Sequence, residues 1–292
     1  MTNEEKKNIK EKNSIERVIY CRTVKGDFAK NMHDILADRK EFIDCSGERP
    51  DIIIESDIEL VGIEHCQVDL LFNLKKKKAQ SMIRTQESKT NRLIEKYKDK
   101  ELLDTDIKNG TALKSVLDLV EERITTRNRF DYVAFKDNFS RVCLDHNDNC
   151  TEYRERLKSI ANDKLVSLGC LVEIPYSKET EYHITDIKGT RKQAIKGIPI
   201  TFDMLFTIQK MNGFDFVILC MYCINNPNDC KNTVCYYFST RNIPEGIKQQ
   251  RIKPVISFDF IEKPDVRFPF EEYKRDEDSI TFTAEASFQK KK

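Results

Sequence analysis

The sequence is poor in the features of membrane and secreted proteins. Its 292 residues contain no tryptophan and only 9 glycines. No run approaches the roughly 18 consecutive apolar residues of a membrane span. Residues 1–14 are charged and lack the hydrophobic segment of a secretory signal. We therefore expect a soluble, cytoplasmic protein without a membrane partner.

Three common catalytic motifs are also missing. The chain has no glycine-rich phosphate loop, no Ser-His-Asp order and no zincin helix. Each motif supplies groups that its chemistry requires: backbone amides around a phosphate, a nucleophile with its base, or paired zinc ligands. Their absence disfavours nucleotide-binding, esterase and metalloprotease functions.

The charge is balanced, because 50 Lys and Arg face 49 Asp and Glu, which gives a formal net charge of +1. A globally basic domain, the simplest mark of a nucleic-acid-binding protein, is therefore absent. Any contact with a polyanion must come from a local basic patch.

The ten cysteines are too sparse for a disulfide scaffold, and several lie in apolar strand-like runs. We interpret most of them as reduced, buried thiols. Neither of two cysteine groups has the spacing of a zinc knuckle, and positions three apart on a strand face opposite sides, so structural zinc is disfavoured. The two groups are Cys143, His146 and Cys150, and Cys220, Cys223, Cys230 and Cys235.

The length suits one large domain or two modest ones. We expect a flexible charged tail over 1–14, an α/β core over 15–230, and a β-rich extension of the same domain over 231–292 that ends in a basic tail. The predicted elements are a strand at 18–21, a helix at 27–37, a β-hairpin at 51–69, a basic helical stretch at 75–100, helices at 111–125 and 151–161, a strand at 165–174, a helix capped by Thr201, a strand at 214–224, and strand-like runs at 234–240, 255–261 and 279–283.

The hairpin has an unusual charge. Residues 51–72 carry six acids and neither Lys nor Arg. Asp51 and Glu64 adjoin the most apolar of the predicted strands. A carboxylate in such a setting costs several kcal/mol unless it is paired or binds a cation. A hairpin can bring these two side chains to one edge of the sheet, where their oxygens suit a hard divalent metal.

A basic segment follows the hairpin. Residues 75–100 contain ten Lys or Arg against three acids, a local net charge of +7. Metal-bound carboxylates beside a cationic helix are typical of phosphodiester hydrolysis, because the metal activates water and the cations hold the polyanion. The candidate nucleic-acid-binding residues are Lys75, Lys76, Lys77, Lys78, Arg84 and Lys89.

These residues carry a resemblance. Pro50-Asp51, an apolar strand, and then Gly62-Ile63-Glu64 resembles the motif of the PD-(D/E)XK, or restriction-endonuclease-like, nuclease superfamily. The resemblance implies a mixed central sheet flanked by helices and a metal-dependent nuclease that cleaves DNA, with RNA left open as a substrate. It also implies that Asp51 and Glu64 bind Mg²⁺ or Mn²⁺.

The third motif position departs from the family, because Cys66 stands where the family has a water-activating lysine. A lysine or arginine of 75–89 is one replacement. His65 is a secondary catalytic candidate, although strand alternation aims it away from Glu64 and places Cys66 on the same face as Glu64. The alternative function is a catalytically inactive module of the nuclease fold that binds nucleic acid or a protein partner.

Overall fold

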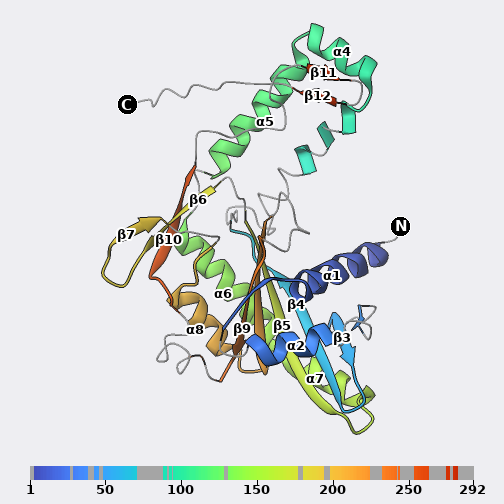
Figure 1. Ribbon diagram of the computed structural model, residues 1–292, viewed down its shortest axis with the longest axis vertical. Helices are drawn as coiled ribbons and strands as arrows, with labels where there is room; N and C mark the ends of the chain where they lie inside the picture. The colour runs from blue at the N-terminus through green and yellow to red at the C-terminus, as the bar shows by residue number, and fades with distance from the viewer. Residues whose placement is uncertain are drawn as a thin grey trace.

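A computed structural model gives the fold of the chain (Figure 1). It describes residues 3–26, 29–38, 43–45, 49–70, 88–90, 92–93, 95–127, 131–176, 180–193, 198–223, 232–241, 243, 253–262, 274–276 and 279–281.

A mixed seven-stranded sheet forms the centre of the described residues. The antiparallel β2, β3 and β4 occupy one side, β4, β5 and β8 run parallel through the middle, and β9 pairs antiparallel with β8 and parallel with β1. This confirms the α/β class and the mixed sheet. In sheet order the strands are β1 (Thr23–Lys25), β9 (Val234–Ser239), β8 (Phe216–Cys223), β5 (Leu165–Tyr176), β4 (Glu59–Gln67), β3 (Ile52–Glu55) and β2 (Ile43–Asp44).

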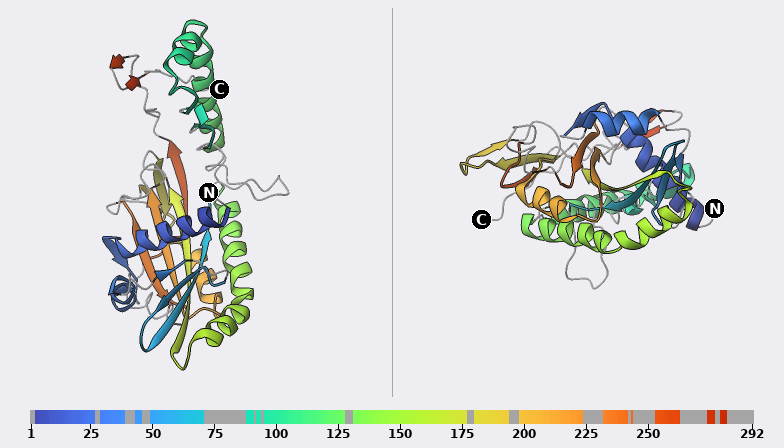
Figure 2. Two further views of the ribbon diagram at one scale, coloured as in Figure 1. Left: turned by 90° about the vertical axis from the view of Figure 1, so that its right-hand side faces the viewer. Right: turned by 90° about the horizontal axis from the view of Figure 1, so that it is seen from below.

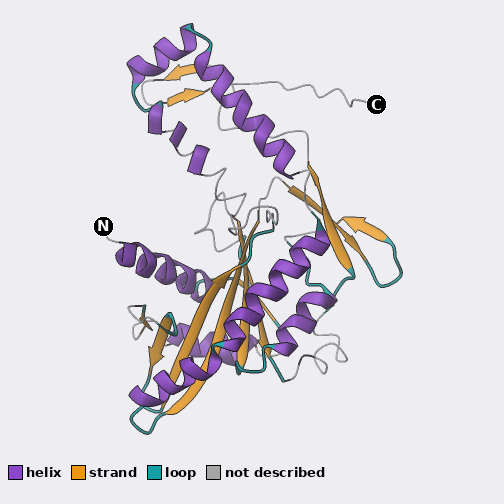
Figure 3. Cartoon of the chain, turned by 180° about the vertical axis from the view of Figure 1, so that it is seen from behind, coloured by secondary structure: helices purple, strands orange, loops and turns teal. Residues whose placement is uncertain are grey.

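Helices cover both faces of the sheet (Figures 2 and 3). Helices α1 (Asn3–Ile19) and α2 (Ala29–Asp38) contribute to the apolar cluster on one face. Helices α6 (Tyr132–Asp148), α7 (Cys150–Ile160) and α8 (Phe202–Lys210) contribute to the cluster on the other. We call these the α1 face and the α6 face.

Strand alternation divides β4 between the two clusters. Val61 and Ile63 belong to the cluster of the α1 face, whereas Leu60 and Cys66 belong to that of the α6 face. Successive side chains of a strand point to opposite faces, so a strand buried on both sides is apolar at almost every position. The polar residues of β4 therefore stand out against a buried background.

Several predicted elements are confirmed. The hairpin is β3 and β4, with Ile52 paired to Ile63. Helix α8 begins after Thr201, whose hydroxyl accepts the Met204 N–H at 3.2 Å as an N-cap. Helix α5 (Thr111–Arg127) covers the predicted 111–125, and β5 and β8 run parallel, as the predicted strand–helix–strand order requires.

The prediction for the N-terminal residues is wrong. Instead of a tail over 1–14 and a strand at 18–21, one helix runs over Asn3–Ile19. Ser14, Ile15 and Val18 are wholly buried at helical spacing. The apolar residues at the C-terminal end of this helix resemble a short strand when considered alone. They lie on the same buried helical face as Glu11 and Ser14, which precede them.

Helix α6 was not among the predicted elements. Its buried residues include Phe135, Phe139 and Cys143, a spacing of four residues that places them on one helical face. Asp131 caps its first turn by accepting the Val133 N–H at 2.9 Å. The polar residues between these apolar positions obscure the periodicity in the sequence.

Further elements lie outside the central sheet. A three-stranded sheet has the order β10 (Ser257–Glu262), β6 (Thr180–Thr185) and β7 (Arg191–Gln193), and β11 (Lys274–Asp276) pairs with β12 (Ser279–Thr281). Of the predicted C-terminal extension, β9 thus belongs to the central sheet. Helix α4 (Lys100–Lys108) packs on α5, and the two extend away from the sheet in Figure 1. Among the described helices, none has the length and hydropathy to cross a bilayer.

Gly26 yields a stability prediction at the β1 edge of the sheet. Its φ is +112°, and an added Cβ would lie 2.2 Å from the Tyr237 carbonyl oxygen. Gly110 has a φ of +71° and no atom within 4 Å of such a Cβ. We expect Gly110→Ala to cost about 1 kcal/mol from backbone strain alone, and Gly26→Ala about 3 kcal/mol because a clash is added. Urea denaturation measures both, and equal losses would contradict the close packing at Gly26.

Candidate functional site

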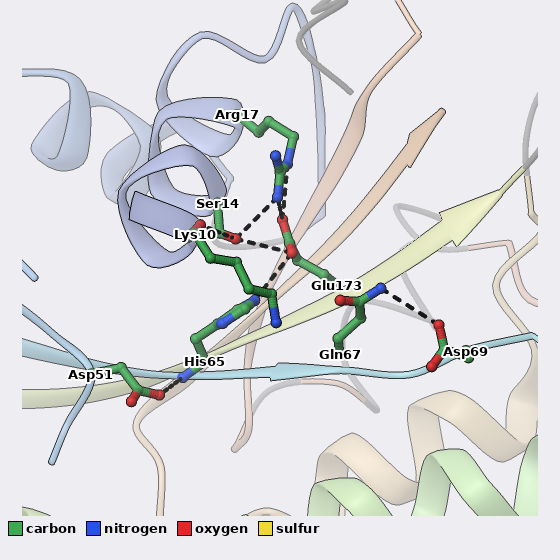
Figure 4. A network of polar contacts seen from close by, with 8 residues as sticks. All are labelled: Lys10, Ser14, Arg17, Asp51, His65, Gln67, Asp69 and Glu173. Carbon is green, nitrogen blue, oxygen red and sulfur yellow. Dashed lines mark hydrogen bonds and ion pairs between the residues drawn. The ribbon is translucent and has the colours of Figure 1, made fainter. Parts of the chain in front are cut away.

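Asp51 immediately precedes β3 and lies beside β4. The register that pairs Ile52 with Ile63, continued by one residue, places Asp51 across from Glu64. The Asp51 side chain is hydrogen-bonded to β4, because its Oδ2 accepts the main-chain N–H of His65 at 3.0 Å (Figure 4). Its Oδ1 lies 2.9 Å from Lys7 Nζ of α1. The carboxylate is thus fixed where β3 begins.

Glu64 points toward the α6 face and is 5% exposed. Its Oε1 accepts the Tyr153 hydroxyl of α7 at 3.1 Å and lies 3.1 Å from Nδ1 of His146 on α6. The hydrogen bond with Glu64 raises the pKa of His146 against the opposing effect of burial. Glu64 Oε2 is buried and has no hydrogen-bond partner among the described residues. One oxygen of this carboxylate is therefore left for a ligand.

Cys66 lies on the same face as Glu64, as alternation predicts, and is buried in the core. Its thiol is hydrogen-bonded with those of Cys143 on α6 and Cys170 on β5, and these bonds lower the pKa of Cys66 although burial opposes them. A lysine here would place its charge in an apolar cluster, where burial disfavours the charged form. The position that carries the family's motif lysine is thus part of the packing in this chain.

His65 points toward the α1 face, opposite to Glu64, as alternation predicts. Its ring is buried, and Nε2 lies 3.1 Å from Oε2 of Glu173 on β5. The side chain is therefore committed to a buried polar network, and only its main-chain N–H reaches Asp51.

Glu173 is the centre of that network and is fully buried (Figure 4). Arg17 of α1 donates to its Oε1 from Nε at 3.0 Å and from Nη2 at 2.7 Å, and Ser14 donates to its Oε2 at 3.0 Å. Burial opposes ionisation, but the contacts with His65 and Arg17 outweigh it, so the pKa of Glu173 is below its ordinary value. The Arg17 guanidinium also lies over the Tyr222 ring, 4.3 Å from its centroid.

Glu11 of α1 is a second buried acid next to Asp51. It is 3% exposed, its Oε1 lies 3.5 Å from Lys7 Nζ, and its Oε2 has no hydrogen-bond partner in the described part of the chain. Burial, together with the charge of Asp51, raises the pKa of Glu11 to about 7. Such a raised pKa is frequent among functional carboxylates.

The residues that surround Asp51 and Glu64 were not predicted from the sequence. Lys7 and Glu11 lie in the segment expected to be a tail, and His146 and Tyr153 follow Glu64 by more than 80 positions. Helical spacing of Glu11, Ser14 and Val18 was the one available signal for α1. Of the nucleic-acid candidates, Lys75, Lys76, Lys77, Lys78 and Arg84 lie outside the described residues, and Lys89 is exposed in a helical turn.

The site has few groups for a metal. Within the described ranges, no three His, Cys, Asp or Glu side chains are grouped so as to hold an ion. Magnesium is often held by only one or two protein carboxylates, and waters and substrate phosphates complete its shell. Asp51 and Glu64, with the unpartnered Glu64 oxygen, fit this sparser type of site.

Comparisons with protein-family profiles, with curated proteins and with solved structures gave no match.

The Glu173 network yields a stability prediction with a matched control. Arg17→Met leaves a buried carboxylate without its guanidinium partner, which we expect to cost about 3–5 kcal/mol at neutral pH. Arg49→Met removes the same type of residue from an exposed pair with Glu152 and should cost less than about 1 kcal/mol. Urea denaturation of both variants tests the difference, and a similar loss in each would contradict a special role for the buried pair.

The pH dependence follows from the same network. The lowered pKa of folded Glu173 contributes stability that is present above its ordinary value of 4.5 and is lost as the pH falls through the folded value. In Arg17→Met, burial instead favours the protonated carboxyl. The deficit in unfolding free energy should therefore be largest at neutral pH and should narrow on acidification. A deficit that is constant from pH 7 to pH 4 would contradict this assignment.

Proposed function

We propose that the chain is a metal-dependent nuclease that hydrolyses phosphodiester bonds of DNA, with Asp51 and Glu64 as the metal-binding acids. The observation that carries this proposal is the placement of Asp51 across from Glu64, whose buried Oε2 has no hydrogen-bond partner among the described residues. The resemblance to PD-(D/E)XK nucleases, which rests on Pro50-Asp51 and Gly62-Ile63-Glu64, implies the same two acids.

Mg²⁺ or Mn²⁺ would supply the chemistry of such a site by lowering the pKa of a bound water and offsetting charge on the phosphate. The chain's own residues orient the two acids. The His65 N–H holds one oxygen of Asp51, and His146 and Tyr153 hold one oxygen of Glu64. Each acid is therefore held in a fixed orientation, and such preorganisation favours stabilisation of the transition state.

A cation from α1 also reaches the site. Lys7 Nζ lies 2.9 Å from Asp51 Oδ1, and its side chain is 49% exposed. Hydrogen bonding and charge interaction with Asp51 outweigh burial and raise the pKa of Lys7. It remains an ammonium at neutral pH, so it acts as a donor and a positive charge and not as a base for water.

Substitution of the two acids tests the catalytic role. Asp51→Asn and Glu64→Gln should each abolish Mg²⁺-dependent cleavage of plasmid and single-stranded DNA, because an amide lacks the ligand charge. Glu55→Gln is the matched control, since Glu55 lies on the same hairpin, is exposed and pairs with Lys164. The control should cleave as the natural chain does. Equal activity in all three variants would overturn the assignment.

Salt dependence tests the basic segment. Binding of a DNA duplex should weaken steeply between about 50 and 200 mM salt, because phosphate neutralisation releases counterions. Changing Lys75, Lys76, Lys77 and Lys78 together to Gln should reduce the slope by about 0.9 for each lost phosphate contact. Fluorescence anisotropy measures both effects. An unchanged slope in the variant would place the DNA on another surface.

The second candidate function is a catalytically inactive module of the same fold that binds nucleic acid or a protein partner. Cys66 favours it, because the family's lysine position is buried among thiols in this chain. Cys66→Ala should leave cleavage nearly unchanged if another cation serves. A natural chain that cleaves neither DNA nor RNA with Mg²⁺ or Mn²⁺, yet binds a duplex, would favour the inactive module.

A further inference from the structure

Lys7 lies between two buried carboxylates on the α1 face. Its Nζ is 2.9 Å from Asp51 Oδ1 and 3.5 Å from Glu11 Oε1. Asp51 is 7% exposed and Glu11 is 3% exposed, whereas the Lys7 side chain is 49% exposed. The two acids are thus fixed in the structure, and the cation reaches them from the solvent side.

Glu11 is incompletely satisfied by this arrangement. Its Oε2 is buried and has no hydrogen-bond partner among the described residues, and its Oε1 has the longer of the two contacts with Lys7. A buried carboxylate oxygen without a donor is costly to maintain, and native structures usually satisfy such atoms with water or an ion. The unpartnered oxygen indicates that the ammonium is an imperfect occupant.

A hard divalent cation satisfies two carboxylates better than one lysine does. It carries twice the charge and takes six or more oxygen ligands, so it can use Oε2 of Glu11 as well as Asp51 and waters. A lysine on a long flexible stem can withdraw into solvent at small cost, because half of its side chain is already there. The geometry therefore allows the two cations to exchange.

We propose that Glu11 and Asp51 form a divalent-cation site in which Lys7 is a built-in, displaceable counter-cation. In the absence of metal, the Lys7 ammonium offsets part of the negative charge of the two acids and keeps α1 on the sheet. A bound metal displaces it, and the freed ammonium lies beside the site, where it can pair with a phosphate. Metal binding by Glu11 and Asp51 does not depend on the proposed function. Only the use of that metal in catalysis rests on it.

Binding of Mn²⁺ alone to the full chain tests the proposal, by calorimetry and without nucleic acid. Lys7→Met removes the competing cation and should tighten Mn²⁺ binding by about tenfold or more, a factor that equals about 1.4 kcal/mol. Glu11→Gln should weaken it by at least about tenfold. Lys12→Met is the matched control, because Lys12 is an exposed lysine of the same helix, and it should bind Mn²⁺ as the natural chain does.

Thermal unfolding gives a second measurement on the same variants. Without metal, Lys7→Met should lower the Tm, because two buried carboxylates lose their counter-cation. Saturating Mn²⁺ should restore the Tm of Lys7→Met, and its increase should exceed that of the natural chain. If Lys7→Met does not fold without metal, Glu11→Gln in the otherwise natural chain decides, since it should lose the Mn²⁺-dependent increase in Tm.

The possible outcomes separate this inference from the proposed function. Mn²⁺ binding that is lost in Asp51→Asn and Glu64→Gln but unchanged in Glu11→Gln and Lys7→Met overturns the displaceable-lysine site and leaves the nuclease proposal standing. Mn²⁺ binding that depends on Glu11 and Lys7 as expected, in a chain that cleaves no nucleic acid, supports the site and contradicts the nuclease. Absence of Mn²⁺ binding to every variant overturns the site.

Discussion

Strand β4 is the element on which the arrangement of the polar residues depends. It is hydrogen-bonded to β3 on one side and to β5 on the other, so its side chains can only point to the two faces of the sheet. Alternation then sends Glu64 to α6 and α7, and His65 to α1. Asp51 caps the N–H of His65 at the start of β3, between these two environments. The pairing register of β3 and β4 therefore places Asp51 across from Glu64.

The α1 face shows how a buried charge is made tolerable next to such a site. Glu173 is wholly buried, and full ionisation there requires the two guanidinium bonds from Arg17 and the contacts with Ser14 and His65. The same helix brings Lys7 to Asp51. Helix α1 therefore covers one face of the sheet and also brings positive charge to the acidic hairpin.

The α6 face has a different character. Around Glu64 it offers a histidine and a tyrosine as hydrogen-bond donors, and around Cys66 it offers thiols. A water-activating lysine at position 66 would be buried inside the apolar cluster. If the chain hydrolyses phosphodiesters, Lys7 on the other face and the basic segment after the hairpin are candidate sources of the assisting cation. This asymmetry separates the chain from the motif that it resembles.

The sequence by itself determined the α/β class, the hairpin over 51–69, the helix capped by Thr201 and the opposite orientation of Glu64 and His65, because periodicity and turn chemistry are local properties. It also singled out Asp51 and Glu64 by their charge within an apolar run. Only the tertiary structure decided which groups meet them. Residues as distant as Lys7 and Tyr153 lie beside the hairpin because α1 and α7 pack on opposite faces of one sheet, and their individual residues carry no local signal of that contact. For the same reason the first residues of α1 resemble a charged tail in the sequence, because their burial depends on packing against the sheet.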